Sequence, residues 1–300
     1  MASYIKKYLK INHFLNTLLF IYMISNDVIK YLCCLNILVY EYDKRFKLNK
    51  NETLSKFLIN DDFNELSKES KQALTFLKKD SLLGTVYFYL NDDDSDLQVG
   101  ITVNDELKRI TVIFRGTDSA RDWYYNLNYC QVDIGDGNLV HKGFYRKLMN
   151  NNSFNHINNI LFSLLHFKKN YDLNITGHSL GGALATLYAF LIKDKVKTDT
   201  KINVISFGSP RLGNFKFRQS FDECNKLSHY RVTNCRDIVT AVPFYNYSHV
   251  GINLYIDSDK LTIYDKYNYN LWFTFSLFTC WNIFDHDIIS YYRNIMKNFQ

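Results

Sequence analysis

The spacing of apolar residues changes several times along the chain, and each change predicts a different kind of element. Residues 1–43 carry apolar side chains at helical intervals in two stretches. A polar stretch follows, and residues 57–77 have the pattern of one or two short surface helices. We therefore expect residues 1–80 to form a helical segment that packs on the domain after it, residues 81–300.

The rest of the chain alternates strand patterns with helical ones. Short runs rich in β-branched and aromatic residues are typical of strands. These runs lie at 86–90, 97–103, 109–114, 172–176, 202–207, 229–233, 249–256 and 260–264. Helical spacing occurs over 150–169, 180–192 and 285–297. Strands that alternate with helices predict an α/β fold, with a central, mostly parallel sheet flanked by helices.

The sharpest change of period falls within residues 172–192, where a strand pattern becomes a helical one. The turn between them is G-H-S-L-G at 177–181, a G-x-S-x-G motif whose glycines suit a turn too tight for a Cβ. A capping serine in an ordinary turn is the alternative, but the strand before and the helix after favour a nucleophile. We expect an exposed Ser179 hydroxyl, with the N–H of Leu180 at a helix N-terminus as a donor to an oxyanion.

A nucleophilic serine needs a general base and an acid that orients the base. In α/β folds with such a turn the chain order is nucleophile, acid, base. The candidates for the base are therefore the histidines that follow Ser179, which are His229, His249 and His286. Asp237 is the best acid because it follows a strand two strands beyond the nucleophile, and His229 precedes it. His286 lies in a loop that we expect to be exposed and mobile. His249 begins an apolar strand, where a structural histidine is more typical. The order thus favours Asp237 and His286 as partners of Ser179, with His249 as the alternative base.

Composition restricts the classes of function. Three hundred residues that are 47% hydrophobic can bury one large core. The net charge of +6 is modest and its Lys and Arg residues are scattered, which argues against nucleic acid as a partner. Six cysteines without C-x-x-C or a metal-ligand spacing predict no metal site. The acidic residues 92–96 lack the glycine and glutamate of a calcium loop and predict a hairpin turn.

The N-terminus combines basic and apolar residues. Lys6, Lys7 and Lys10 precede the mostly apolar residues 14–24, as in the first two regions of a signal peptide. No small-x-small cleavage site follows, and the run is too short to span a bilayer. The pattern leans toward a secreted or membrane-associated protein, but an amphipathic helix packed on the domain explains it equally well.

Seven blocks between residues 85 and 294 resemble, in the same order, the motifs of the class 3 lipases, the fungal triacylglycerol lipase type. The blocks are R-G-T at 115–117, V-H-K-G-F at 140–144, G-H-S-L-G-G-A at 177–183, F-G-S-P-R-L-G-N at 207–214, D-I-V at 237–239 with Pro243, Y-S-H-V-G at 247–251, and Asp285-His286 with Tyr291. The resemblance implies an α/β-hydrolase fold with a nucleophile elbow and a lid.

The resemblance also implies roles for individual residues. It implies Ser179 as nucleophile, Asp237 as acid and His286 as base. It further implies that Thr117 joins Leu180 in the oxyanion hole, and that a lid opens with the segment from Ser119 to Trp123.

We therefore expect a serine-dependent ester hydrolase that needs no metal or cofactor, most simply an acylglycerol lipase that works through an acyl-enzyme. A phospholipase A1 or another esterase would use the same residues, and a non-catalytic protein that binds lipid or a partner is disfavoured by the intact triad. The substrate would be an acylglycerol or phospholipid at a lipid–water interface. Trp123 and the aromatic residues 268–284, which include Trp272 and Phe278, could contact the membrane surface, although residues 268–284 also fit a buried strand.

Overall fold

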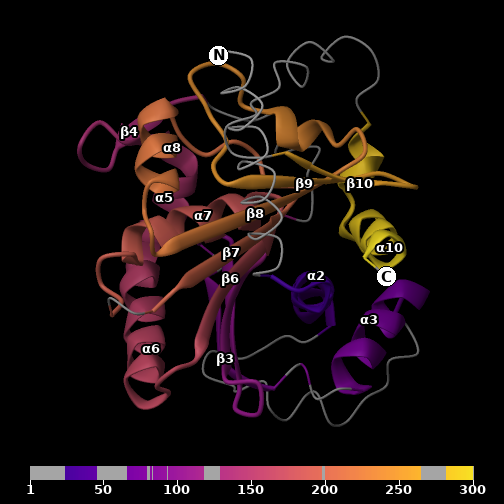
Figure 1. Cartoon of the computed structure of the whole chain (residues 1–300). Coiled ribbons are helices and arrows are strands. Elements are labelled where there is room, and N and C mark those ends of the chain that lie inside the picture. The colour runs from indigo at the N-terminus through magenta and orange to yellow at the C-terminus, as the bar shows by residue number, and fades with distance from the viewer. Residues whose placement is uncertain are drawn as a thin grey trace, which may run out of the picture.

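An eight-stranded sheet runs through the middle of the molecule (Figure 1). The computed structural model describes residues 24–45, 66–79, 82, 84–92, 94–117, 129–197, 200–264 and 282–299. In their order across the sheet the strands are β1 Thr85–Asp92, β2 Leu97–Asn104, β3 Arg109–Phe114, β6 Asp172–His178, β7 Ile202–Phe207, β8 Leu227–Asn234, β9 Ile252–Ile256 and β10 Leu261–Tyr264. Strands β3, β6, β7, β8 and β9 are parallel, whereas β1, β2 and β10 join through antiparallel pairs. The sheet is thus mostly parallel, as predicted.

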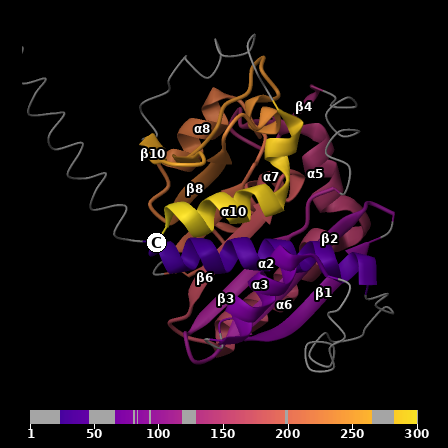
Figure 2. The same cartoon turned by 90° about the vertical axis from the view of Figure 1, so that its right-hand side faces the viewer.

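Helices cover both faces of this sheet (Figures 1 and 2). One face carries α5 Lys142–Met149, α6 Ser153–Phe167, α7 Leu180–Ile192 and α8 Phe215–Asp222, and the other carries α2 Asn26–Arg45, α3 Lys68–Lys79 and α10 Ile288–Asn298. The remaining elements are the short pair β4 Gln131–Asp133 and β5 Leu139–His141 and the 3-10 turns η3 Asn150–Asn152, η4 Ile238–Ala241 and η6 Ile283–His286. None of the helices in the described part of the chain is both long and apolar enough to cross a membrane.

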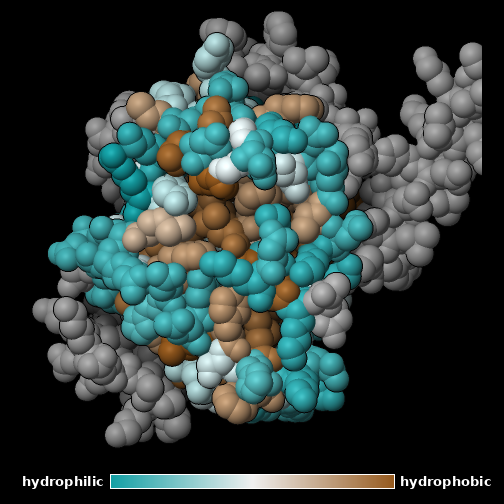
Figure 3. All heavy atoms as spheres, turned by 90° about the vertical axis from the view of Figure 1, so that its left-hand side faces the viewer, coloured by the Kyte–Doolittle hydropathy of each residue, from teal (hydrophilic) through white to brown (hydrophobic). Residues whose placement is uncertain are grey.

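The two faces of the sheet bury separate hydrophobic cores. The first lies beneath α5 to α8, and the second lies beneath α2, α3 and α10. Strands β6 and β7 are buried on both sides, which explains why their sequences are nearly continuous apolar runs. On the outer surface over α5, α6 and α8, hydrophilic residues predominate and hydrophobic ones gather in a band near the middle (Figure 3).

Three predicted elements begin later than their hydrophobic pattern suggests. The helix predicted over 150–169 begins at Ser153, because Asn151 and Asn152 have positive φ and interrupt it. The last helix begins at Ile288, after a separate 3-10 turn. The strand predicted to begin at His249 begins at Ile252, because Gly251 takes φ +71°. The hairpin predicted at the acidic residues after Asp92 joins β1 to β2.

The helix α2 is fixed to the sheet by buried polar side chains as well as apolar ones. The Tyr31 hydroxyl lies 3.2 Å from Oγ1 of Thr111 on β3. The Asn36 amide donates to Oγ1 of Thr176 on β6 over 2.8 Å. These bonds join residues far apart in the sequence and set the register of α2 over the strands. Helix α2 therefore lies on the sheet and α3 packs against α2, while the expected boundary at residue 80 stays a prediction.

Candidate active site

The turn between β6 and α7 places Ser179 where the strand ends and the helix begins. Ser179 has φ +58° and ψ −129°, a backbone conformation that most residues avoid. A Cβ at position 177 would lie 2.6 Å from the backbone nitrogen of Gly182, and one at position 181 would lie 2.8 Å from the carbonyl carbon of Arg115. Glycine is therefore required at both flanks, as the sequence motif indicates.

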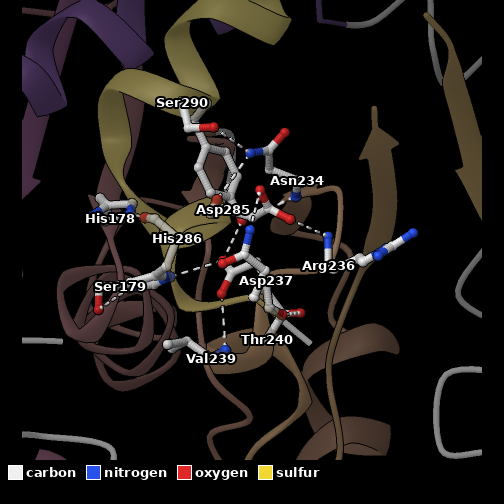
Figure 4. A network of polar contacts seen from close by, with 12 residues as sticks. His178, Ser179, Asn234, Arg236, Asp237, Val239, Thr240, Asp285, His286 and Ser290 are labelled. Atoms are coloured by element: carbon white, nitrogen blue, oxygen red, sulfur yellow. Dashed lines mark hydrogen bonds and ion pairs between the residues drawn. The ribbon is translucent and has the colours of Figure 1, made fainter. Parts of the chain in front are cut away.

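The three side chains predicted to form a triad lie in one hydrogen-bonded row (Figure 4). The Ser179 hydroxyl oxygen is 2.8 Å from Nε2 of His286, and Nδ1 of His286 is 2.8 Å from Oδ2 of Asp237. A carboxylate oxygen accepts, so Nδ1 of the neutral ring carries the proton and Nε2 accepts from the serine. The geometry suits proton transfer from the serine to the histidine.

Two sequence-based expectations about exposure are wrong. Ser179 is 0% exposed and His286 is 2% exposed, although both were expected at the surface. The hydroxyl lies against the ring of His286, and the Ser179 N–H donates to the carbonyl of Phe207 at the end of β7. Because the row of hydrogen bonds brings the side chains into contact, each one covers the next.

The loop that carries His286 is also held more firmly than expected. The Asn234 amide donates to the carbonyl of Asp285 over 2.9 Å, and the N–H of Arg236 donates to the Asp285 carboxylate over 3.0 Å. The Asn282 side chain caps η6 by accepting from Phe284. The loop is thus bound to the end of β8 and to the turn after it, which carries the predicted acid (Figure 4).

The carboxylate of Asp237 is fixed by two donors besides the histidine. The N–H of Val239 donates to Oδ1 over 2.9 Å, and the Tyr291 hydroxyl donates to Oδ2 over 2.6 Å. Burial raises the pKa of the Tyr291 hydroxyl well above its ordinary value, and the neighbouring Asp237 adds to this effect, so the tyrosine stays a donor. Beside the carboxylate, Gly208 has φ +59°, and a Cβ there would lie 2.9 Å from Oδ2.

The two residues expected in the oxyanion hole lie on neighbouring segments. Leu180 is the first residue of α7, so its N–H is free of an acceptor within the helix. Thr117 follows β3, and a Cβ on the preceding Gly116 would lie 3.2 Å from Cβ of Ser179. Within the described residues, the shielded hydroxyl of Thr117 has no hydrogen-bond partner. An unpaired buried hydroxyl on the residue after Gly116 is suited to a substrate oxygen.

The structure separates His249 from the row of hydrogen bonds. Its Nε2 lies 2.7 Å from the carbonyl oxygen of Thr240. Burial lowers the pKa of this imidazole well below its ordinary value, and the guanidinium groups of Arg231 and Arg211 lower it further. The ring is therefore a neutral donor to a carbonyl, which is a structural role.

The lid residues Ser119 and Trp123 lie outside the described residues, as do the aromatic residues 268–281 with Trp272 and Phe278. Their roles stay predictions.

Three residues near the site, His178, Tyr40 and Tyr291, have no role predicted from the sequence. His178 Nε2 lies 2.8 Å from the backbone carbonyl oxygen of His286, and the Tyr40 hydroxyl lies 2.9 Å from His178 Nδ1. Nothing local distinguishes Tyr40 from the other aromatic residues of α2. The signal that could have identified Tyr291 is its place beside Asp285-His286 in the last block of the family resemblance.

Comparison with known proteins relates part of this chain to one family. The family model described as lipase (class 3) matches residues 111–247. A Caenorhabditis elegans lipase, ZK262.3, is 35% identical over 148 residues, covering 48% of this chain and 40% of the relative. The triacylglycerol lipase OBL1 of Ricinus communis is 29% identical over 200 residues, covering 50% of this chain and 38% of the relative. Phospholipase A1-II 3 of Oryza sativa subsp. indica is 30% identical over 189 residues, covering 54% of this chain and 45% of the relative. The chain thus spans less than half the length of these relatives.

Solved structures agree on the fold. The crystal structure of the lipase from Rhizopus microsporus var. chinensis superposes with a TM-score of 0.68 at 22% sequence identity, covering 87% of this chain and 85% of that one. The predicted α/β-hydrolase fold is confirmed by this match and by the mostly parallel sheet between two layers of helices. Taken with this fold, the match of residues 111–247, which include the G-x-S-x-G turn, supports a relationship to the class 3 lipase family.

Proposed function

We propose that this protein is a serine-dependent carboxylic ester hydrolase that acts on acylglycerols. The observation that carries the proposal is the unbroken row from Asp237 through His286 to the Ser179 hydroxyl, with 2.8 Å at both junctions. This row can draw the proton from the serine as its oxygen attacks an ester carbonyl.

In the proposed reaction, Ser179 Oγ bonds to the carbonyl carbon and its proton moves to His286 Nε2. The N–H of Leu180 and the Thr117 hydroxyl bind the oxyanion, and Asp237 stabilises the imidazolium. Collapse of the tetrahedral intermediate expels the alcohol, which takes the proton from Nε2. Water then attacks the acyl-enzyme with His286 as base, which releases the fatty acid and restores the serine.

The relatives favour a lipid ester as substrate, since those named above include a triacylglycerol lipase and a phospholipase A1. Exposed aromatic side chains near the site support action at a lipid surface. Phe284, two residues before His286, is 81% exposed, and Tyr245, on the segment after Asp237, is 87% exposed.

The test is hydrolysis of nitrophenyl esters of increasing acyl length by the wild type and by Ser179→Ala. We expect activity in the wild type and a loss of about 10⁴-fold or more in the variant, with its melting temperature retained. A folded wild type without esterase activity that still binds lipid vesicles would instead establish a non-catalytic lipid-binding protein.

Phospholipase A1 activity is the second candidate, because the rice relative carries that name at an identity similar to that of the triacylglycerol lipase. Fatty acid release from emulsions in which trioleoylglycerol and phosphatidylcholine compete distinguishes the two activities. Preferential release of the sn-1 fatty acid from phosphatidylcholine would replace the acylglycerol assignment.

A further inference from the structure

A buried row of hydrogen bonds connects α2 to the predicted base. The Tyr40 hydroxyl is 2.9 Å from Nδ1 of His178, and Nε2 of His178 is 2.8 Å from the backbone carbonyl oxygen of His286. Figure 4 shows His178 beside His286. We propose that Tyr40 and His178 are positioning residues that hold the catalytic histidine in line with the serine, an inference that rests on the proposed hydrolase function.

The direction of each bond in this row follows from the groups involved. A carbonyl oxygen only accepts, so Nε2 of His178 must carry a proton. Burial lowers the pKa of His178 well below its ordinary value, and nearby His286 lowers it further, so the ring is neutral and carries one proton. Its Nδ1 is then an acceptor, and the Tyr40 hydroxyl donates to it.

This arrangement gives the Tyr40 hydroxyl a specific effect. It supplies a donor to Nδ1 in the tautomer of His178 that the His286 carbonyl requires, since the other tautomer would set a lone pair of Nε2 against that carbonyl oxygen. The bond fixes the backbone of the residue whose ring must stay 2.8 Å from the Ser179 hydroxyl oxygen. The two imidazole rings also pack together, with their centroids 4.7 Å apart.

Tyr40 contacts the oxyanion side of the site as well. A Cβ on Gly116 would collide with the Tyr40 hydroxyl and would lie 2.6 Å from the carbonyl oxygen of His178. Gly116 directly precedes Thr117, and the guanidinium carbon of Arg115 lies 5.9 Å from the centre of the Tyr40 ring. The hydroxyl of Tyr40 thus reaches the base through His178 and packs against the loop that carries the second oxyanion donor.

The same helix provides a matched control. Tyr31 also places its hydroxyl against a buried polar side chain, Thr111 Oγ1, at 3.2 Å. It lies nine residues before Tyr40, about 13 Å along the helix. Removal of either hydroxyl weakens the attachment of α2 to the sheet, but only removal of the Tyr40 hydroxyl affects His178.

The experiment compares Tyr40→Phe with Tyr31→Phe in the full chain, with a soluble short-chain nitrophenyl ester as substrate. We expect Tyr40→Phe to lower kcat by about 10-fold with little change in KM, because a misplaced base costs rate rather than binding. Tyr31→Phe should lower the melting temperature to a similar extent and keep kcat within about two-fold of the wild type. Equal kcat values for the two variants would overturn the proposal.

A second measurement does not depend on turnover. The proton on Nδ1 of His286, shared with Asp237, should give a downfield proton resonance that His286→Ala removes. We expect this resonance to shift or split in Tyr40→Phe and to stay in place in Tyr31→Phe. An unchanged resonance in Tyr40→Phe would overturn the positioning role, whereas a wild type that hydrolyses no ester would overturn only the proposed function.

Discussion

At the scale of single residues, the site combines a strained backbone with side chains whose hydrogen bonds are almost all satisfied. Ser179 keeps φ +58° because glycines flank it, and the Asp237 carboxylate accepts from His286, Val239 and Tyr291. Within the described residues, the Thr117 hydroxyl, which follows Gly116, is buried and unpaired. Satisfied groups hold the geometry, and the unpaired one is available to a substrate.

The choice of base is testable by one pair of substitutions. We expect His286→Ala to reduce turnover by about 10⁴-fold or more while the protein stays folded. His249→Ala should keep most of the activity and lose about 1–2 kcal/mol of unfolding free energy, because it removes the donor to the Thr240 carbonyl. Ester hydrolysis and urea denaturation of both variants measure this. Retained activity in His286→Ala, together with an inactive but folded His249→Ala, would reverse the assignment.

The oxyanion role of Thr117 has its own control. Thr117→Val should lower kcat by about 10²–10³-fold, since one donor to the oxyanion is lost. Thr111→Val removes a buried hydroxyl from β3, the strand that precedes Thr117, and should lower stability without this loss of rate. If a folded Thr117→Val keeps the wild-type kcat, its hydroxyl has no part in the mechanism.

At the scale of elements, the carboxyl ends of the parallel strands bring the functional segments together. The proposed nucleophile follows β6, the proposed acid follows β8, and η6 brings the proposed base back to the same edge of the sheet. This is where α/β sheets place their sites. The opposite edge, where α6 leads into β6, lies at the far end of those strands.

This arrangement allows a test of the proposed lipid contact. Phe284→Ser combined with Tyr245→Ser should lower activity on emulsified triacylglycerol by about 10-fold, because fewer apolar side chains enter the interface. Hydrolysis of a soluble ester should not change. Phe167→Ser is the control, since Phe167 is 76% exposed but lies at the end of α6, at the opposite edge of the sheet. Equal effects of the two changes on emulsions would argue against a contact surface at the site.

At the scale of the whole molecule, the two helical layers enclose several histidines as neutral rings. Burial lowers the pKa of His178, His229 and His249 well below the ordinary value, and neighbouring ionisable groups add to this effect. In the unfolded chain these rings take up protons as the pH falls through about 6.5. The native state then binds fewer protons than the unfolded state, so stability is complete above this pH and decreases below it.

The free energy of unfolding should therefore decrease on acidification from pH 7.5 to pH 5.5. Each of these rings contributes up to about 1.4 kcal/mol per pH unit below the unfolded pKa. Urea denaturation at several pH values measures the slope of the unfolding free energy against pH. His249→Gln should reduce this slope by the contribution of about one bound proton. A slope that is the same in this variant and in the wild type would show that His249 is not kept neutral by the fold.

Much of the fold and of the candidate site could be predicted from local patterns. The runs at 109–114 and 202–207 match β3 and β7, because a strand buried on both faces must be apolar along its length. The spacing of the glycines around Ser179 reflects contacts within a few residues. Chain order then selected Asp237 and His286, which lie in one row with the serine in the structure.

Other features were decided only by the tertiary structure. The burial of Ser179 and His286 depends on loops that come together from different parts of the chain. The bond from Tyr40 to His178 joins residues 138 positions apart, and hydrophobic spacing describes only which face of a helix is buried. It does not describe which strand that face meets, or at which register. The sequence alone therefore determined the elements and the order of the chemical groups, whereas packing of α2 on the sheet decided which polar groups meet, since those contacts exist only once distant segments are in place.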